Sequence, residues 1–145
     1  MRKLALVWAL VGVFAMGFGT AWAEDIVIVV NDNAPVQSLD AREVKEIYLG
    51  ETGYWGDQRI TPVGYQDGTP IQGTFLDKVV NISENVYKTY WIKRIFREGG
   101  VPPTKAGSSE EALRMVSQSA GGITYIPASA LASAGGVREV FRVTN

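Results

Sequence analysis

Short apolar runs alternate with segments of helical periodicity along the chain after residue 25. Residues 26–30 (IVIVV) form a continuous β-branched run, which is typical of a strand covered on both faces. Residues 60–63 and 123–126 predict two further short strands, and residues 137–143 alternate apolar and charged positions, as expected for a strand with one exposed face. Strands alternating with helices predict a layered α/β fold, with a mixed sheet flanked by helices.

Three of the segments between these strands have amphipathic periodicity and clear helix starts. The first lies within residues 39–50, with Ser38 or Asp40 as its N-cap. The second begins at Pro70, a residue that fits the first position of a helix. The third follows a capping-box pattern over residues 108–111. Their predicted buried faces are Val44, Ile47 and Tyr48; Ile71, Phe75, Leu76, Val79 and Val80; and Leu113, Met115 and Val116.

A longer helix is predicted from Ser83 or Asn85 to the stop at Gly99. Its apolar residues recur at mixed spacings of three and four, and we expect that face to be buried. The residues of this face are Val86, Tyr87, Tyr90, Trp91, Ile95 and Phe96, and the basic residues Lys88, Lys93 and Arg94 are expected on the other side.

Residues 1–23 have the organisation of an export signal. Arg2 and Lys3 precede an uncharged apolar stretch over residues 4–18, and residues 21–23 (AWA) form a small-x-small cleavage site. A retained membrane helix is the alternative, but the stretch is shorter than the roughly 20 residues that span a bilayer. We therefore expect a cleaved signal peptide, a single domain over residues 24–145 and a periplasmic location.

Composition removes several classes of function. The chain contains no histidine and no cysteine, so the common proton shuttle, thiol nucleophile and zinc-ligand sets are missing, and no cofactor is expected. Cleavage after Ala23 would leave 12 basic and 15 acidic residues, a net charge of −3 that offers no footprint for nucleic acid. A hydrolase based on carboxylates stays open, although the closest acidic pairs, Glu43 with Glu46 and Glu110 with Glu111, are better explained as a solvated helix face and a helix cap.

The loop before the Pro70 helix is the strongest candidate for a binding site. A helix start offers unpaired N–H groups and partial positive charge to an oxyanion. Gly68 allows close approach to the backbone, and Thr69 adds a hydroxyl group. The alternative is an ordinary capped helix in which Thr69 bonds its own backbone.

Aromatic residues offer a second candidate surface. Tyr87 and Trp91 are spaced like core residues of an amphipathic helix, whereas Tyr54, Trp55 and Tyr65 lie in or beside predicted loops. The second group is therefore open to stacking on a ligand or to contact with a partner.

The order of several motifs resembles the phosphate-binding subunits of ABC-type phosphate uptake systems. In that family, corresponding pieces read IFxG, W, R-x-D-G-S-G-T and GAIGYV. The matching stretches here are IYLG at 47–50, WGD at 55–57, ITPV at 60–63, DGT at 67–69 with Phe75 downstream, YW at 90–91 and GGITYI at 121–126. The resemblance covers nearly the whole chain after the signal segment.

The resemblance implies the fold of a type II periplasmic binding protein, reduced to a single lobe, because members of that family close two lobes around a ligand and this chain is long enough for one. It further implies a non-enzymatic solute-binding role, with inorganic phosphate or a similar oxyanion as the ligand. A membrane permease or a second copy of the chain would be the partner. The implied ligand-binding residues are Gln66, Asp67, Gly68, Thr69, Ile71 and Gln72.

The loop departs from the family pattern where it would hold the anion. Asp67 and Gly68 match, and Thr69 conservatively replaces a serine. Tyr65, Pro70 and Ile71 stand where the family has an arginine, a glycine and a threonine. Because the arginine and one N–H donor are lost, phosphate binding by the loop alone is expected to be weak. The alternative function is a single-lobe interaction module without a small-molecule ligand.

Overall fold

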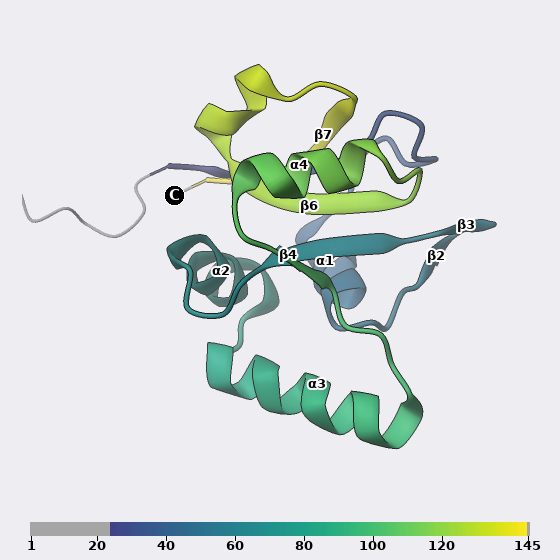
Figure 1. The fold of residues 1–145 in the computed structure, drawn as a ribbon, viewed down its shortest axis with the longest axis vertical. Helices are drawn as coiled ribbons and strands as arrows, with labels where there is room; N and C mark the ends of the chain where they lie inside the picture. The colour runs from purple at the N-terminus through teal and green to yellow at the C-terminus, as the bar shows by residue number, and fades with distance from the viewer. Residues whose placement is uncertain (1–23, 145) are drawn as a thin grey trace, which may run out of the picture.

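The computed structural model describes residues 24–144 and contains a five-stranded mixed sheet (Figure 1). The strand order is β5-β4-β6-β1-β7; β4 pairs in parallel with both β5 and β6, and β1 pairs antiparallel with both β6 and β7. The strands of this sheet are β1 (Ile26–Asn31), β4 (Thr61–Tyr65), β5 (Thr104–Ala106), β6 (Gly122–Pro127) and β7 (Val137–Val143). The predicted mixed sheet is therefore confirmed, and β5 is a strand that the sequence pattern did not indicate.

Helices cover both faces of this sheet. Every residue of β1 is buried, as its β-branched run predicted, and its side chains alternate between two apolar clusters. Ile28 belongs to the large cluster that includes residues of α1 and α2, whereas Val29 belongs to a smaller one beside η2. The helices are α1 (Ala41–Tyr48), α2 (Pro70–Phe75), the π-helical η1 (Leu76–Val80), α3 (Glu84–Glu98), α4 (Ser109–Ser117) and the 3-10 helix η2 (Ala128–Ser133).

The centre of the large cluster is aromatic. Phe75 stacks on Tyr125 with ring centroids 3.8 Å apart, and Tyr48 meets both rings edge-on. The Tyr48 hydroxyl donates to the carbonyl oxygen of Val63 at 2.9 Å, so its polar end is satisfied inside the core. This cluster joins α1, α2 and the two central parallel strands.

The helix starts agree with the predicted positions but differ in their hydrogen bonds. Asp40 caps α1 in a full capping box with Glu43. Thr69 occupies the N-cap position before Pro70, but its hydroxyl donates to the carbonyl of Gln66 at 3.0 Å instead of accepting from the helix. The predicted Thr69 side-chain cap is therefore wrong. At α4 the Ser108 side chain accepts from the backbone of the third helical residue, Glu111, but the Glu111 carboxylate accepts from Gly107, so the predicted reciprocal box is only half formed.

Tyr54 and Trp55 form a strand of their own. β2 (Tyr54–Trp55) and β3 (Gln58–Arg59) make a short antiparallel hairpin that precedes β4. Gly121 lies against the backbone of Arg59, where a Cβ would stand 1.7 Å from the Arg59 carbonyl oxygen. Only glycine allows this close backbone contact.

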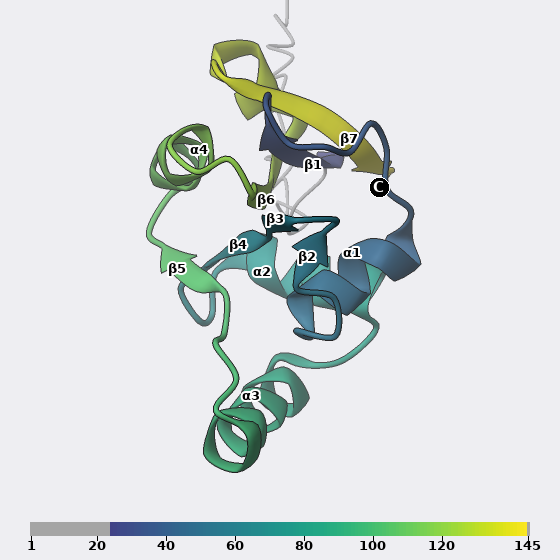
Figure 2. The same cartoon turned by 90° about the vertical axis from the view of Figure 1, so that its right-hand side faces the viewer.

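α3 is displaced from the sheet in both views of the fold (Figures 1 and 2). Trp91 is its one buried residue, so the prediction that its whole apolar face is buried is wrong. Phe96 is 92% exposed, and Val86, Ile92 and Ile95 are exposed as well. The helix begins at the Ser83 cap and ends at Gly99 in the left-handed conformation, as predicted.

Four side chains of α3 attach it to the C-terminal end of α1. They donate to three successive carbonyl groups that the helix end leaves without intrahelical partners. The contacts are Tyr87 Oη and Trp91 Nε1 to Tyr48 O (3.0 and 3.3 Å), Tyr90 Oη to Leu49 O (2.5 Å) and Arg94 Nη2 to Gly50 O (2.8 Å). Arg94, expected on the solvated side, therefore faces inward and brings positive charge to the negative end of the α1 dipole.

The predicted signal peptide, residues 1–23, lies outside the described residues. Among residues 24–144, none of the helices combines the length and the apolar character needed to cross a bilayer.

Replacing Arg94 with methionine tests the attachment of α3. Arg94→Met keeps a long apolar stem but leaves the Gly50 carbonyl without this donor and removes the cation at the end of α1. We expect the free energy of unfolding in urea to fall by about 1–3 kcal/mol. Arg97→Met, an exposed position of the same helix, should change it by less than about 0.5 kcal/mol. Equal losses for the two variants would show that these polar contacts do not hold α3.

Candidate functional site

The six predicted binding residues occupy the turn after β4 and the first turn of α2. Gln66, Asp67 and Gly68 are exposed, and Gly68 has the positive φ of 82° that its turn requires. Ile71 is buried in the apolar core and faces no ligand space. Asp67 and Gln72 are the two residues of the predicted set that line a cavity.

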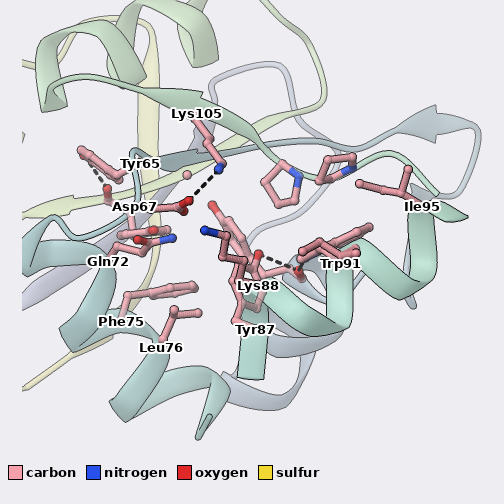
Figure 3. A pocket seen from close by; sticks show the side chains of 16 residues that line it. Tyr65, Asp67, Gln72, Phe75, Leu76, Tyr87, Lys88, Trp91, Ile95 and Lys105 are labelled. Carbon is pink, nitrogen blue, oxygen red and sulfur yellow. Dashed lines mark hydrogen bonds and ion pairs between the residues drawn. The ribbon is translucent and has the colours of Figure 1, made fainter. Parts of the chain in front are cut away.

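That cavity, of about 190 Å³, lies between the sheet, α2 and α3. Its walls come from segments far apart in the sequence, including β4, β5, α3 and the prolines at 102–103. Figure 3 shows that its two ends differ. Asp67, Gln72, Lys88 and Lys105 gather at one end, whereas Trp91 and Ile95 lie at the other.

The polar end carries two cations and one anion. Lys105 Nζ lies 3.1 Å from Asp67 Oδ2, in a half-exposed ion pair between β5 and the loop after β4. The hydrogen bond from Lys105 is the main reason that the pKa of Asp67 lies below its usual value, and a hydrogen bond from Gln72 and the charge of Lys88 act in the same direction. Lys88 extends from α3 toward this pair (Figure 3). The end therefore has an excess of positive charge.

Gln72 lies at the base of the polar end and is only 5% exposed. Its Oε1 atom is buried and has no hydrogen-bond partner within the part of the chain that the structure describes. A buried acceptor without a donor is costly, by about 1–3 kcal/mol. Since this residue lines the cavity, a donor group on a bound molecule could satisfy it.

The rest of the cavity is apolar. Phe75 and Tyr125 form its floor through their stacked rings, and Trp91, Ile92 and Ile95 contribute the wall on α3. Gly64 also lines the cavity. A Cβ at this position would make ordinary contacts, 3.6 Å from the Tyr125 hydroxyl and 3.9 Å from Pro103 Cβ, and would not clash with the backbone. A ligand of this site therefore meets apolar surface behind a charged mouth.

The prediction that Tyr65 is open to a ligand or a partner is wrong. Tyr65 is buried at the end of β4, where its hydroxyl donates to the Tyr125 carbonyl at 2.8 Å, although it contributes to the cavity wall. Tyr54 is exposed and lines a different hollow, and Trp55 packs against the core, so Tyr54, Trp55 and Tyr65 form no common surface. Tyr87 and Trp91 line the cavity as well as packing inward.

Lys88 and Lys105 are the charged residues of this candidate site that the sequence did not identify. Lys105 reaches Asp67 because β5 pairs in parallel with β4, in a register that places Tyr65 opposite Ala106. The one available signal was the short stretch TKA after Pro102-Pro103. Lys88 is exposed, as expected for the solvated side of its helix, but this side of the helix faces the mouth of the cavity.

The acidic residues considered for catalysis serve other contacts. Glu43 belongs to the cap of α1, Glu46 pairs with Arg42, and Glu111 accepts from Gly107. Over residues 24–144, no group of three or more histidine, cysteine, aspartate or glutamate side chains is placed to hold a metal ion.

No family model and no curated protein matches the chain. Solved structures do match. An ABC-type phosphate transport receptor from Vibrio cholerae superposes with a TM-score of 0.61 at 18% identity, covering 81% of this chain and 45% of that chain. PstS from Borrelia burgdorferi superposes with a TM-score of 0.64 at 15% identity, covering 83% of this chain and 48% of that chain.

The chain thus spans about half the length of these structures. At such identities the similarity shows the fold alone. It confirms the predicted architecture, a mixed sheet flanked by helices that corresponds to about half of each of these structures.

Buried tyrosines around the cavity make the fold sensitive to alkali. Burial raises the pKa of Tyr65 and of Tyr87 from 10.0 to about 12, and it raises the pKa of Tyr48 and Tyr125 strongly. The unfolded chain loses these protons first, so the free energy of unfolding should fall as pH rises from about 10 toward about 12. Urea titrations at a series of pH values measure this slope.

Tyr65→Phe removes one of these buried protons and should make the alkaline slope shallower. The exposed Tyr54→Phe is the matched control and should leave the slope unchanged. If the free energy of unfolding fell with pH equally in both variants and the parent, the alkaline sensitivity could not be assigned to the buried Tyr65.

Proposed function

We propose that the chain is a non-enzymatic, periplasmic solute-binding protein that binds a small oxyanion weakly at the mouth formed by Asp67, Lys88 and Lys105. The observation that carries this proposal is the convergence of two ammonium groups from different elements on the loop that the sequence singled out. The similarity to phosphate-transport binding proteins supports the same class of ligand. Delivery to a membrane permease is the role that such proteins suggest.

Lys105 compensates in part for the arginine that the loop lacks. Tyr65 occupies the arginine position and its hydroxyl is engaged inside the core, so it cannot serve the anion. Lys105 supplies a positive charge from the adjacent strand instead, 3.1 Å from Asp67. A lysine offers a point charge rather than a bidentate fork, which is consistent with weak binding.

Asp67 selects among oxyanions. Its lowered pKa keeps the carboxylate ionised, so it disfavours an anion that has no hydrogen-bond donor and accepts a hydrogen bond from one that has a donor on or beside its acid group. Phosphate keeps a proton near neutral pH, whereas sulfate does not. The mouth should therefore favour phosphate over sulfate.

Titration of residues 24–145 with phosphate, sulfate and a neutral sugar tests this function. At constant ionic strength, phosphate at 100 times its dissociation constant should stabilise the fold by about 2.7 kcal/mol. Lys105→Met should weaken phosphate binding about tenfold or more, because one charge-assisted contact is lost. Lys93→Met, exposed on the same helix as Lys88, is the matched control and should bind like the parent. No effect of any anion would refute the proposal.

Exposed apolar residues along α3 favour a second candidate function, an interaction module that pairs with a second copy of itself. Ile92, Ile95 and Phe96 are 59%, 45% and 92% exposed and form one row on the helix. Two copies of such a row are complementary to each other, as a twofold interface requires. A second copy seated there would also cover the open side of the cavity, since Ile92 and Ile95 line it.

Sedimentation over a concentration series tests the self-association. We expect the mass to rise from monomer to dimer with concentration. Phe96→Glu should keep the chain monomeric without loss of stability, because the side chain is almost fully exposed. Lys93→Glu, a charge change on the same helix, should still dimerise. A monomer at every concentration would eliminate the interaction module while leaving the anion-binding proposal standing.

A further inference from the structure

We infer that the ligand of this cavity is a small organic oxyanion: an acid group with a hydrogen-bond donor on or beside it, attached to an apolar body of about the size of a benzene ring. This inference rests on the proposed function and names the class of ligand for the same site. Two features of the cavity support this inference: the apolar chamber behind the mouth and the unsatisfied Gln72 oxygen. A bare inorganic anion would leave both unused.

The cavity suits a ring with an attached acid group in size and lining. The whole cavity, polar end included, measures about 190 Å³, compared with roughly 150 Å³ for an apolar cavity that takes up benzene. Phe75 and Tyr125 offer a stacked aromatic floor, and Trp91 faces it from α3. An inorganic anion held by Lys88 and Lys105 would leave this apolar surface in contact with water, whereas an aromatic or branched body would cover it.

Gln72 specifies the donor. Its Oε1 is buried, lies at the base of the charged mouth and lacks a partner among the described residues, while its amide group donates toward Asp67. A hydroxyl group next to the acid group of a ligand can donate to this oxygen while the acid group contacts the lysines. A hydroxy acid or a protonated phosphate ester on an apolar body meets all three conditions.

Four probes separate these contributions: inorganic phosphate, acetate, phenylacetate and mandelate. Acetate and phenylacetate share an acid group and differ in the ring, and mandelate adds one hydroxyl group to phenylacetate. By calorimetry on residues 24–145, we expect phenylacetate to bind about tenfold or more tightly than acetate. Mandelate should bind about threefold to tenfold more tightly than phenylacetate, the effect of one buried hydrogen bond.

Two variants assign each gain to its residue. Gly64→Val adds a side chain at a residue that lines the cavity, where a Cβ would make ordinary contacts with Tyr125 and Pro103. It should abolish the gain from the ring, measured as the ratio of phenylacetate affinity to acetate affinity within the same variant. Gln72→Leu should abolish the gain from the hydroxyl group, measured as the ratio of mandelate affinity to phenylacetate affinity within the same variant. Gly53→Val is the matched control for the first variant, because Gly53 lies outside this cavity with open space around it, and it should behave like the parent.

The outcomes separate this inference from the proposed function. Phosphate binding with phenylacetate no tighter than acetate would overturn the organic ligand and leave the anion site intact. A ring gain that survives Gly64→Val, or a hydroxyl gain that survives Gln72→Leu, would overturn the placement of the body or of the donor. Failure of all four probes would overturn both proposals, and Lys105→Met should weaken every probe that binds.

Discussion

The C-terminal end of α1 is the point at which α3 is attached to the rest of the molecule. A helix end leaves its last carbonyl groups without intrahelical donors, and inside a protein those groups need partners. Here the carbonyls of residues 48–50 accept from one face of α3, and Arg94 adds a positive charge where the α1 dipole is negative. The position of α3 therefore follows from the hydrogen-bonding needs of another helix.

This polar attachment accounts for the cavity between the sheet, α2 and α3. A helix held by a continuous apolar stripe would pack directly on the sheet and fill the space between them. α3 instead stands off, with its tyrosine and tryptophan donors reaching the end of α1 and its remaining apolar residues left exposed (Figure 2). The space that remains beside α2 becomes the chamber, and Lys88 comes to its mouth on the same helix.

Periodicity predicted the elements that are buried by local patterning. β1, α1 and the stripe from Ile71 to Val80 lie where the apolar spacing places them. β1 is apolar and buried on both faces, whereas α1 and the stripe each bury one apolar face in the large cluster. The same reasoning failed for α3. Tyr87, Tyr90 and Trp91 face inward as predicted, but they attach the helix to α1 by donating hydrogen bonds, whereas Val86, Ile95 and Phe96 are exposed. Periodicity cannot distinguish these two roles, and only the orientation of a distant helix end decides between them.

Only the part of the candidate site that is local in the sequence was predictable. Asp67 and Gln72 belong to the turn after β4 and the first turn of α2, whose turn chemistry and family resemblance are visible in the sequence. Lys105 joins them through strand pairing, and Lys88 through the position of α3. The change of cation matters chemically. An arginine in the loop would grip a planar array of oxygens with a rigid fork, while two flexible ammonium groups set no such geometry. If the proposed oxyanion binding is right, the shape and polarity of the cavity, with its apolar chamber and its buried Gln72 oxygen, are the features that would determine which oxyanion is held.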